Sequence, residues 1–132
     1  VSPKDTMKRK QFQKGMTQLA QEGAVQIFEQ PGALDSFVVG AVGMLQFEVL
    51  EYRLKNEYSV DLLNHTLPYS VARWIDGDVD TSTLKGLDNA MIVKDNRNRT
   101  VVLISNEWQM GWVIERNPDI TFLHTPKLHN EI

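Results

Sequence analysis

Cysteine is absent from the 132-residue sequence, and no apolar run reaches the length of a membrane span. Without thiols the chain has neither disulfides nor thiolate-bound metal, which agrees with a reducing compartment. A spanning helix needs about 20 consecutive apolar residues, and the charged N-terminal stretch is unlike a signal peptide. We therefore expect no membrane association.

An excess of positive charge is also lacking, because 14 lysines and arginines face 17 aspartates and glutamates, for a net charge of −3. No global basic field draws such a chain to nucleic acid. Hydrophobic residues at 42% and charged residues at 23% are ordinary for a globular domain. We expect one α+β domain over residues 1–125 and a flexible tail over residues 126–132. The first residue is Val rather than Met, which favours a fragment of a longer protein.

Sequence patterns of nucleophilic catalysis are missing. There is no G-x-S-x-G elbow, and no spacing singles out a Ser–His–Asp set. Because triads are assembled in space, a small hydrolase stays open as a minor alternative. The phosphate-binding pattern G-x-x-x-x-G-K-[ST] is absent as well. We assign no catalytic residue and no cofactor-binding residue.

Three aspartates, Asp76, Asp78 and Asp80, alternate as they do in a calcium-binding loop. The glycine needed at the sixth position of such a loop is Thr81 here, and the closing glutamate is Leu87. No histidine pair has the close spacing of a zinc site; the histidines are His65, His124 and His129. We interpret the aspartates as an acidic surface turn and assign no metal ligand.

The stretch over residues 37–58 carries the clearest folding pattern. A β-branched run leads into a turn containing Gly40 and Gly43, and an amphipathic helix follows. Apolar residues at three- and four-residue spacing share one face of this helix: Met44, Phe47, Leu50, Leu54 and Tyr58. Glycines before a helix allow a phosphate to approach its N-terminus, and G-x-x-G also occurs in RNA-binding loops. A strand-to-helix packing turn is the favoured interpretation.

Two further helices are predicted. The first covers residues 6–22, with Asp5 as its N-terminal cap and Gly23 as its stop. The last begins after Asn106, and Gln109 stands in the position of a capping box. The helical positions of Trp108 and Trp112, and the apolar surroundings of Trp74, predict core packing for all three tryptophans rather than base stacking.

The remaining segments alternate between apolar runs and turn residues. A short helix is expected over residues 81–87, and strands are expected at 24–28, 36–39, 60–64, 69–75, 91–93, 101–104 and 120–123. The first two strands and the 91–93 and 101–104 pair form hairpins. The pattern indicates an α+β fold, largely an antiparallel sheet with helices on one face.

Positive charge gathers locally at two places. These candidate RNA contacts are Lys8, Arg9, Lys10 and Lys14 on the first helix, and Arg97 and Arg99 at a hairpin tip. Phosphate contacts need only point charges on an exposed surface, so both groups are suited to RNA. A solvated helical face explains the same residues without a partner.

Several runs resemble the third, C-terminal domain of a bacterial translation-termination GTPase family, peptide chain release factor three. The runs are G-M-T-Q-L at residues 15–19, E-G-A-V-Q at 22–26, G-A-V-G-x-L-Q-F-x-V at 40–49, R-L-x-x-E-Y-x-V at 53–60, A-R-W at 72–74 and P-D-I-x-F at 118–122. They cover nearly the whole chain. The resemblance implies a ferredoxin-like, two-layer α/β sandwich extended by a C-terminal hairpin, helix and strand.

The resemblance also implies a function. The chain is expected to be a non-catalytic ribosome-docking and conformational-coupling domain in the cytoplasm, contacting ribosomal RNA and ribosomal proteins. GTP and Mg²⁺ are expected in a preceding GTPase domain, followed by a barrel domain. The whole protein is expected to dissociate class-I release factors after peptide release. A free-standing single-strand RNA-binding module using the Gly40–Gly43 turn is the alternative.

Related third domains begin with a strand before their first helix. Here only Val1 and Ser2 precede the predicted helix. We therefore expect this strand to be missing and the sheet to expose an edge.

Overall fold

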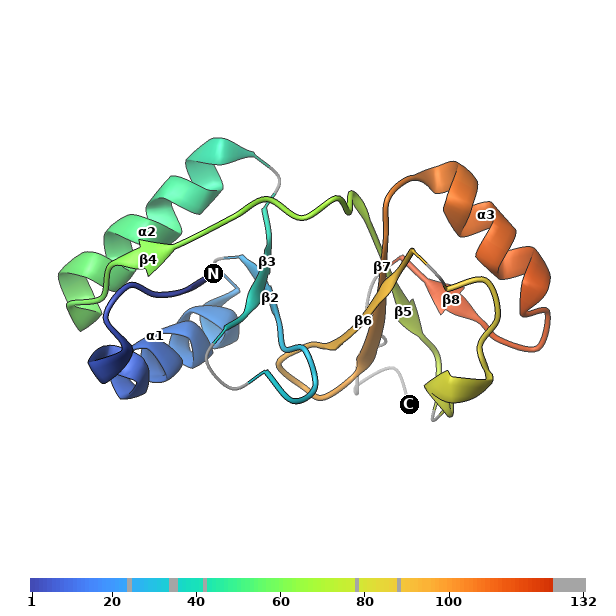
Figure 1. The fold of residues 1–132 in the computed structure, drawn as a ribbon, viewed down its shortest axis with the longest axis horizontal. Coiled ribbons are helices and arrows are strands. Elements are labelled where there is room, and N and C mark those ends of the chain that lie inside the picture. Colours follow the sequence, from blue (N-terminus) through green and yellow to red (C-terminus); the bar gives the residue numbers. More distant parts are fainter. Residues whose placement is uncertain (24, 34–35, 42, 78, 88, 125–132) are drawn as a thin grey trace. The chain divides into compact units, whose positions relative to one another are not determined.

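The computed structural model describes residues 1–23, 25–33, 36–41, 43–77, 79–87 and 89–124. Its helices are α1 (Arg9–Glu22), α2 (Met44–Tyr58) and α3 (Glu107–Arg116), with 3₁₀ turns η1 (Thr6–Lys8) and η2 (Thr81–Thr83) (Figure 1). The strands are β1 (Ser2–Pro3), β2 (Gln26–Phe28), β3 (Val38–Gly40), β4 (Leu62–Leu63), β5 (Val71–Ile75), β6 (Met91–Lys94), β7 (Thr100–Ile104) and β8 (Phe122–Leu123). Helices mixed with antiparallel strands confirm the α+β class.

Contacts divide the chain into two compact units. The first comprises Val1–Thr66 with Asp95–Arg97, and the second comprises Leu67–Lys94 with Asn98–Ile132. A unit defined by contacts is not the same as an independently folding domain. The single domain expected over residues 1–125 therefore stays a prediction, and the tail expected at residues 126–132 lies outside the described residues.

The first helix forms where the sequence predicted it. Asp5 caps its opening turn, because a side-chain oxygen accepts from the backbone N–H of Met7 at 2.9 Å. The chain passes from η1 into α1 and stops at Gly23, whose φ of 73° lies in the left-handed region open to glycine. Local capping thus fixes both ends of the predicted 6–22 helix.

Close approach to α2 requires a glycine on α1. A Cβ added to Gly15 would lie 2.6 Å from Leu54 Cδ2, so no larger side chain fits without movement. Leu50 and Leu54 of α2 are buried, and Phe47 and Tyr58 pack against the same core. Met44 is 71% exposed, so its predicted place on the buried face is wrong, because the core contacts begin further along the helix.

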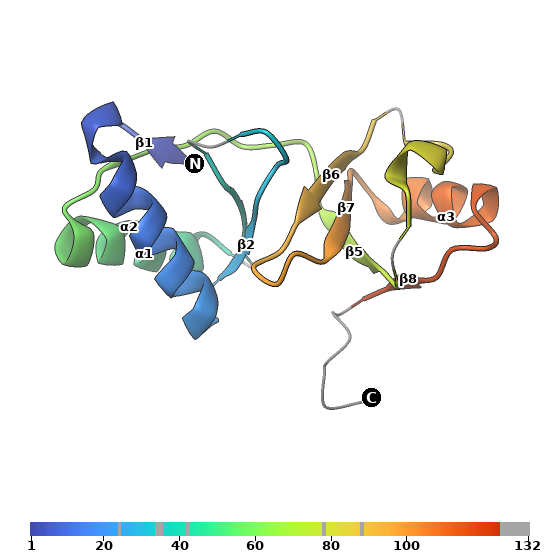
Figure 2. The ribbon, with the colours of Figure 1, turned by 90° about the horizontal axis from the view of Figure 1, so that it is seen from below.

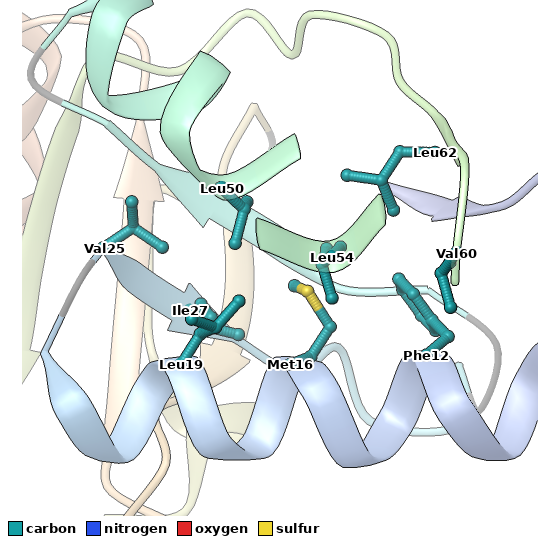
Figure 3. Packing of buried hydrophobic residues seen from close by; sticks show 9 residues of the cluster. All are labelled: Phe12, Met16, Leu19, Val25, Ile27, Leu50, Leu54, Val60 and Leu62. Atoms are coloured by element: carbon teal, nitrogen blue, oxygen red, sulfur yellow. The ribbon is translucent and has the colours of Figure 1, made fainter. Parts of the chain in front are cut away.

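Two small sheets accompany these helices. The β2–β3 hairpin pairs Gln26 with Gly40 and Phe28 with Val38, as the sequence predicted. The expectation of a missing first strand is wrong, since Ser2 and Pro3 pair antiparallel with Leu63 and Leu62. Figure 3 shows the resulting core, in which side chains of α1 and α2 point toward one another: Phe12, Met16, Leu19, Val25, Ile27, Leu50, Leu54, Val60 and Leu62.

The second unit is a four-stranded antiparallel sheet in the order β6-β7-β5-β8, with α3 beside it (Figure 2). The predicted 91–93 and 101–104 hairpin is present, and Trp74 on β5 pairs with Val101 on β7. Asn106 caps α3 by accepting from Gln109 N–H at 2.9 Å. The sheet and α3 share one core: Val71, Ile75, Val102, Ile104, Met110 and Val113.

The tryptophan prediction holds at one position and fails at two. Trp74 is buried, whereas Trp108 is 78% exposed and Trp112 is 44% exposed. The prediction fails for Trp108 and Trp112 because α3 packs Met110 and Val113 against the sheet. The two indoles therefore lie on another face of the helix. Among the described residues, the strands divide among three sheets rather than one. Across the residues that the structure describes, no helix is long and apolar enough to cross a membrane.

Candidate functional site

The basic N-terminal group, Lys8, Arg9, Lys10 and Lys14, lies on η1 and the first turns of α1. Its residues do not face solvent equally, since Lys8 is half-buried and the other three are exposed. The first turn of α1 contains no acidic residue, so Arg9 and Lys10 stand at the positive end of the helix dipole. Such placement is unfavourable by about 0.3–1 kcal/mol per charge in the first turn. The result is a locally positive surface on a chain with negative net charge.

Lys8 has a structural partner. Its Nζ donates to the backbone carbonyl of Ser59 at 2.7 Å, at the C-terminal end of α2. A cation there satisfies a helix carbonyl and complements the negative end of the dipole. Lys8 therefore ties the start of α1 to the end of α2, and a phosphate would compete with that contact. Arg9 also interacts within the chain.

Lys10 and Lys14 are the pair best placed to meet a polyanion. They are four residues apart on α1, so their side chains share one helical face, and both are exposed. Within the described part of the chain, no carboxylate forms an ion pair with either side chain. Two adjacent cations on a rigid helix can thus bind phosphates without breaking an internal contact.

Arg97 and Arg99 lie in the loop of the β6–β7 hairpin. The loop is ordered by Asp95, whose side chain accepts from the backbone N–H of Arg97 at 2.9 Å, and by Asn98 with a φ of 61°. Arg97 is exposed, whereas Arg99 is half-buried and interacts within the chain. The two arginines occupy a different element from the basic N-terminal group, and we treat them as a separate surface.

The two glycines before α2 have different environments. Gly40 ends β3, and a Cβ there would lie 3.3 Å from the Gln26 Cβ and 3.4 Å from the Phe28 Cε2, so close packing favours glycine. Gly43 has extended backbone, and nothing lies within 4 Å of its Cβ position. Val42 lies outside the described residues. A packing role therefore accounts for Gly40 and gives no steric reason for Gly43.

Arg53 of α2 forms ion pairs with a glutamate of each helix, Glu22 of α1 at 2.9 Å and Glu57 of α2 at 2.7 Å. The hydrogen bonds that Arg53 donates to Glu57 and Glu22 raise the pKa of Arg53, and the bond accepted by Glu57 lowers the pKa of Glu57. These pairs join α1 to α2 and compensate the positive charge of Arg53.

Within the acidic turn, Asp80 caps the η2 turn, and the backbone N–H of Asp76 donates to the Thr121 carbonyl at 3.0 Å. Asp80 accepts from the Ser82 hydroxyl at 2.7 Å and from the Ser82 backbone N–H at 3.0 Å, and these bonds lower the pKa of Asp80. Asp78 lies outside the described residues. In the ranges that are described, no three potential metal-ligating side chains come together.

The chain is thus an α+β protein that presents exposed lysines on one helix. Comparison with known proteins then gives its family. Residues 1–114 match the family described as "Class II release factor RF3, C-terminal domain". The chain belongs to this family.

Curated relatives carry the same family name. The chain is 46% identical over 125 residues to peptide chain release factor 3 of Symbiobacterium thermophilum, covering 92% of the chain. It is 39% identical over 120 residues to the protein of that name from Macrococcus caseolyticus, covering 91% of the chain. The chain spans 23% of the length of each relative. The match therefore concerns one domain of a much longer protein.

Proposed function

We propose that this chain is a docking domain of a translation-termination factor, and that the exposed lysines of α1 contact phosphates of ribosomal RNA. The observation that carries the proposal is the Lys10–Lys14 pair, exposed and without a carboxylate partner among the described residues, in a chain of the release factor family. Contacts to phosphates position a protein on RNA without reading its sequence.

The fold is suited to transmit force from such a contact. Gly15 brings α1 against α2, and Arg53 links Glu22 to Glu57 across the two helices. A load applied to Lys10 or Lys14 therefore acts on a packed helix pair rather than on a loose segment. This is the physical basis for conformational coupling in the proposed role.

The wider activity belongs to the longer protein. From the family to which the chain belongs, and from relatives of which it spans 23%, we propose that a preceding domain binds GTP with Mg²⁺. In the same proposal the whole protein acts in the cytoplasm with a preceding barrel domain and promotes dissociation of class-I release factors. In this proposal GTP is hydrolysed in that preceding domain.

The direct test is binding of the 132-residue chain to purified bacterial ribosomes. The variant Lys10→Ala/Lys14→Ala should weaken binding several-fold at low salt, because two phosphate contacts are lost. Thr17→Ala/Gln18→Ala removes two exposed neutral side chains from the same helix and is the matched control. Equal affinities for both double variants and the unmodified chain would contradict the phosphate role.

A chimera tests the wider role. This chain replaces the matching segment of the Symbiobacterium thermophilum relative, which is 46% identical. We expect the chimera to accelerate class-I release factor recycling, and we expect a version without this segment to be defective. Full recycling without the segment would overturn the docking role. Binding of the isolated chain to single-stranded oligonucleotides that is lost in Gly43→Asp would instead favour the RNA-binding module.

A further inference from the structure

The second unit contains an open hollow that the proposed docking role does not use. Its volume is about 190 Å³, and its walls include Ala90, Ile104 and the two exposed indoles Trp108 and Trp112. Asn89 and Gln109 add side-chain amides to the lining. Apolar walls with a few polar groups are the usual composition of a binding site. An indole that is 78% exposed has no evident role in the stability of this unit.

Gly86 of the lining follows Lys85, whose backbone is held in place by Asn117, which is 7% exposed. Its side chain accepts from the Lys85 backbone N–H at 2.9 Å and donates to the Lys85 carbonyl at 2.8 Å. It also donates to the Val113 carbonyl of α3 at 2.8 Å. At Gly86, a Cβ would lie 3.3 Å from the Trp112 ring. Lys85 and Gly86 are thus held against α3 by contacts within the chain itself.

A cation borders the hollow. The Arg116 guanidinium lies 3.8 Å from the centre of the Trp112 ring, and the Arg116 Cγ would lie 3.8 Å from a Cβ at Gly86. Over the residues that can be described, Arg116 forms no ion pair with a carboxylate. Glu107 pairs with Arg73 at 2.7 Å. Arg116 therefore offers positive charge to a ligand that carries a carboxylate.

The size of the hollow argues for a single side chain. Sites for small molecules and cofactors usually enclose about 300–1,000 Å³, whereas this hollow encloses about 190 Å³. Tryptophan and arginine beside a small apolar depression are also the composition of hot spots at protein interfaces. RNA is less suitable, because its affinity depends on several phosphate contacts and Glu115 follows Trp112 on the same helix.

We propose that the hollow binds an acidic–apolar peptide segment of a protein partner. One aliphatic or aromatic side chain fills the hollow, and a neighbouring carboxylate pairs with Arg116. The Asn89 and Gln109 amides bond to the main chain of the peptide. This site is separate in sequence and chemistry from the lysine pair of α1.

A peptide library displayed on phage, selected on the 132-residue chain, tests the proposal. We expect enriched peptides that carry an apolar residue flanked by Asp or Glu. Synthetic versions should lose about tenfold or more of their affinity for Trp112→Ala, the loss typical of a hot spot, and should also bind Arg116→Gln more weakly. Lys10→Ala/Lys14→Ala should bind them normally, which separates this result from the ribosome assay.

The matched control is Ile114→Ala, an apolar side chain of α3 that is 46% exposed and outside the hollow. It should leave peptide affinity unchanged, and circular dichroism should show that all variants are folded. No enrichment, enrichment of peptides without carboxylates, or equal affinity for Trp112→Ala would each overturn the proposal. Binding of oligouridine or oligoadenine that depends on Trp112 would overturn it in favour of base stacking.

Discussion

Helices α1 and α3 use their apolar residues differently. In α1 the stripe formed by Phe12, Met16 and Leu19 is fully buried, and the exposed face is polar and basic. In α3 only Met110 and Val113 are buried, while two tryptophans face solvent. The apolar side chains of this α1 stripe are thus buried in the core, whereas α3 carries apolar side chains that its sheet does not cover. Excess apolar surface of this kind marks interaction sites.

The largest expected effect concerns the buried side of the helix pair. Leu54→Ala should lower the free energy of unfolding by about 3 kcal/mol, because Leu54 is fully buried and its loss leaves a cavity. Val49→Ala on the same helix removes a side chain that is 47% exposed and should change stability by less than about 0.5 kcal/mol. Urea unfolding followed by circular dichroism measures both. Equal losses would contradict the described burial.

Asn117→Ala should lower the free energy of unfolding by about 2 kcal/mol, because the backbone N–H and carbonyl of Lys85 lose their partner. Asn106→Ala is a comparison at the other end of α3, where one exposed capping bond is lost and about 1 kcal/mol is expected. Thermal unfolding ranks the two variants. A smaller loss for Asn117→Ala than for Asn106→Ala would show that Asn117 does not hold the loop.

Two helical glycines sharpen the comparison, because the same substitution should act in opposite directions. Gly15→Ala should destabilise by about 1 kcal/mol or more, since overpacking against Leu54 outweighs the gain in helix propensity. Gly111→Ala on α3 has nothing within 4 Å of the new Cβ and should stabilise by about 0.5–1 kcal/mol. The readout is the sign of the shift in the midpoint of thermal unfolding for each variant. Stabilisation by both would refute the tight α1–α2 approach.

The smallest effect concerns pH. Arg53 lowers the pKa of Glu57 in the folded chain, so this glutamate contributes stability above its ordinary pKa of 4.5 and loses it as pH falls through the lower folded value. Glu57→Gln should therefore flatten the fall of the midpoint temperature on acidification. Glu48→Gln, an exposed glutamate of the same helix, is the control. If the midpoint temperature falls equally with pH in Glu57→Gln and in the unmodified chain, Glu57 does not contribute to the acid dependence of stability.

Local signals predicted much of the fold. The start of the η1 turn that leads into α1, the end of α1 and the start of α3 follow from Asp5, Gly23 and Asn106, whose capping bonds involve residues two to four positions away. Both hairpins follow from alternating apolar runs with turn residues between them. These features depend on the chain nearby, so the sequence is enough to place them.

The errors concern features set by distant residues. Apolar residues at helical spacing do not indicate which of them contact the rest of the core. Trp108, Trp112 and Met44 were therefore expected to be buried. The β1 strand depends on pairing with residues 62–63, and two residues carry no pattern of their own. The partner of Lys8 is a carbonyl at Ser59, 51 positions away. Asn117 and the hollow it supports likewise had no local signal in the sequence.

The dependence of ribosome binding on salt tests the central claim most directly. If Lys10 and Lys14 each contact a phosphate, the slope of log affinity against log salt should fall by about 1 for each lysine replaced by alanine. We therefore predict a slope about 2 units shallower for Lys10→Ala/Lys14→Ala, and an unchanged slope for Thr17→Ala/Gln18→Ala. Identical slopes for the unmodified chain and both double variants would contradict the account.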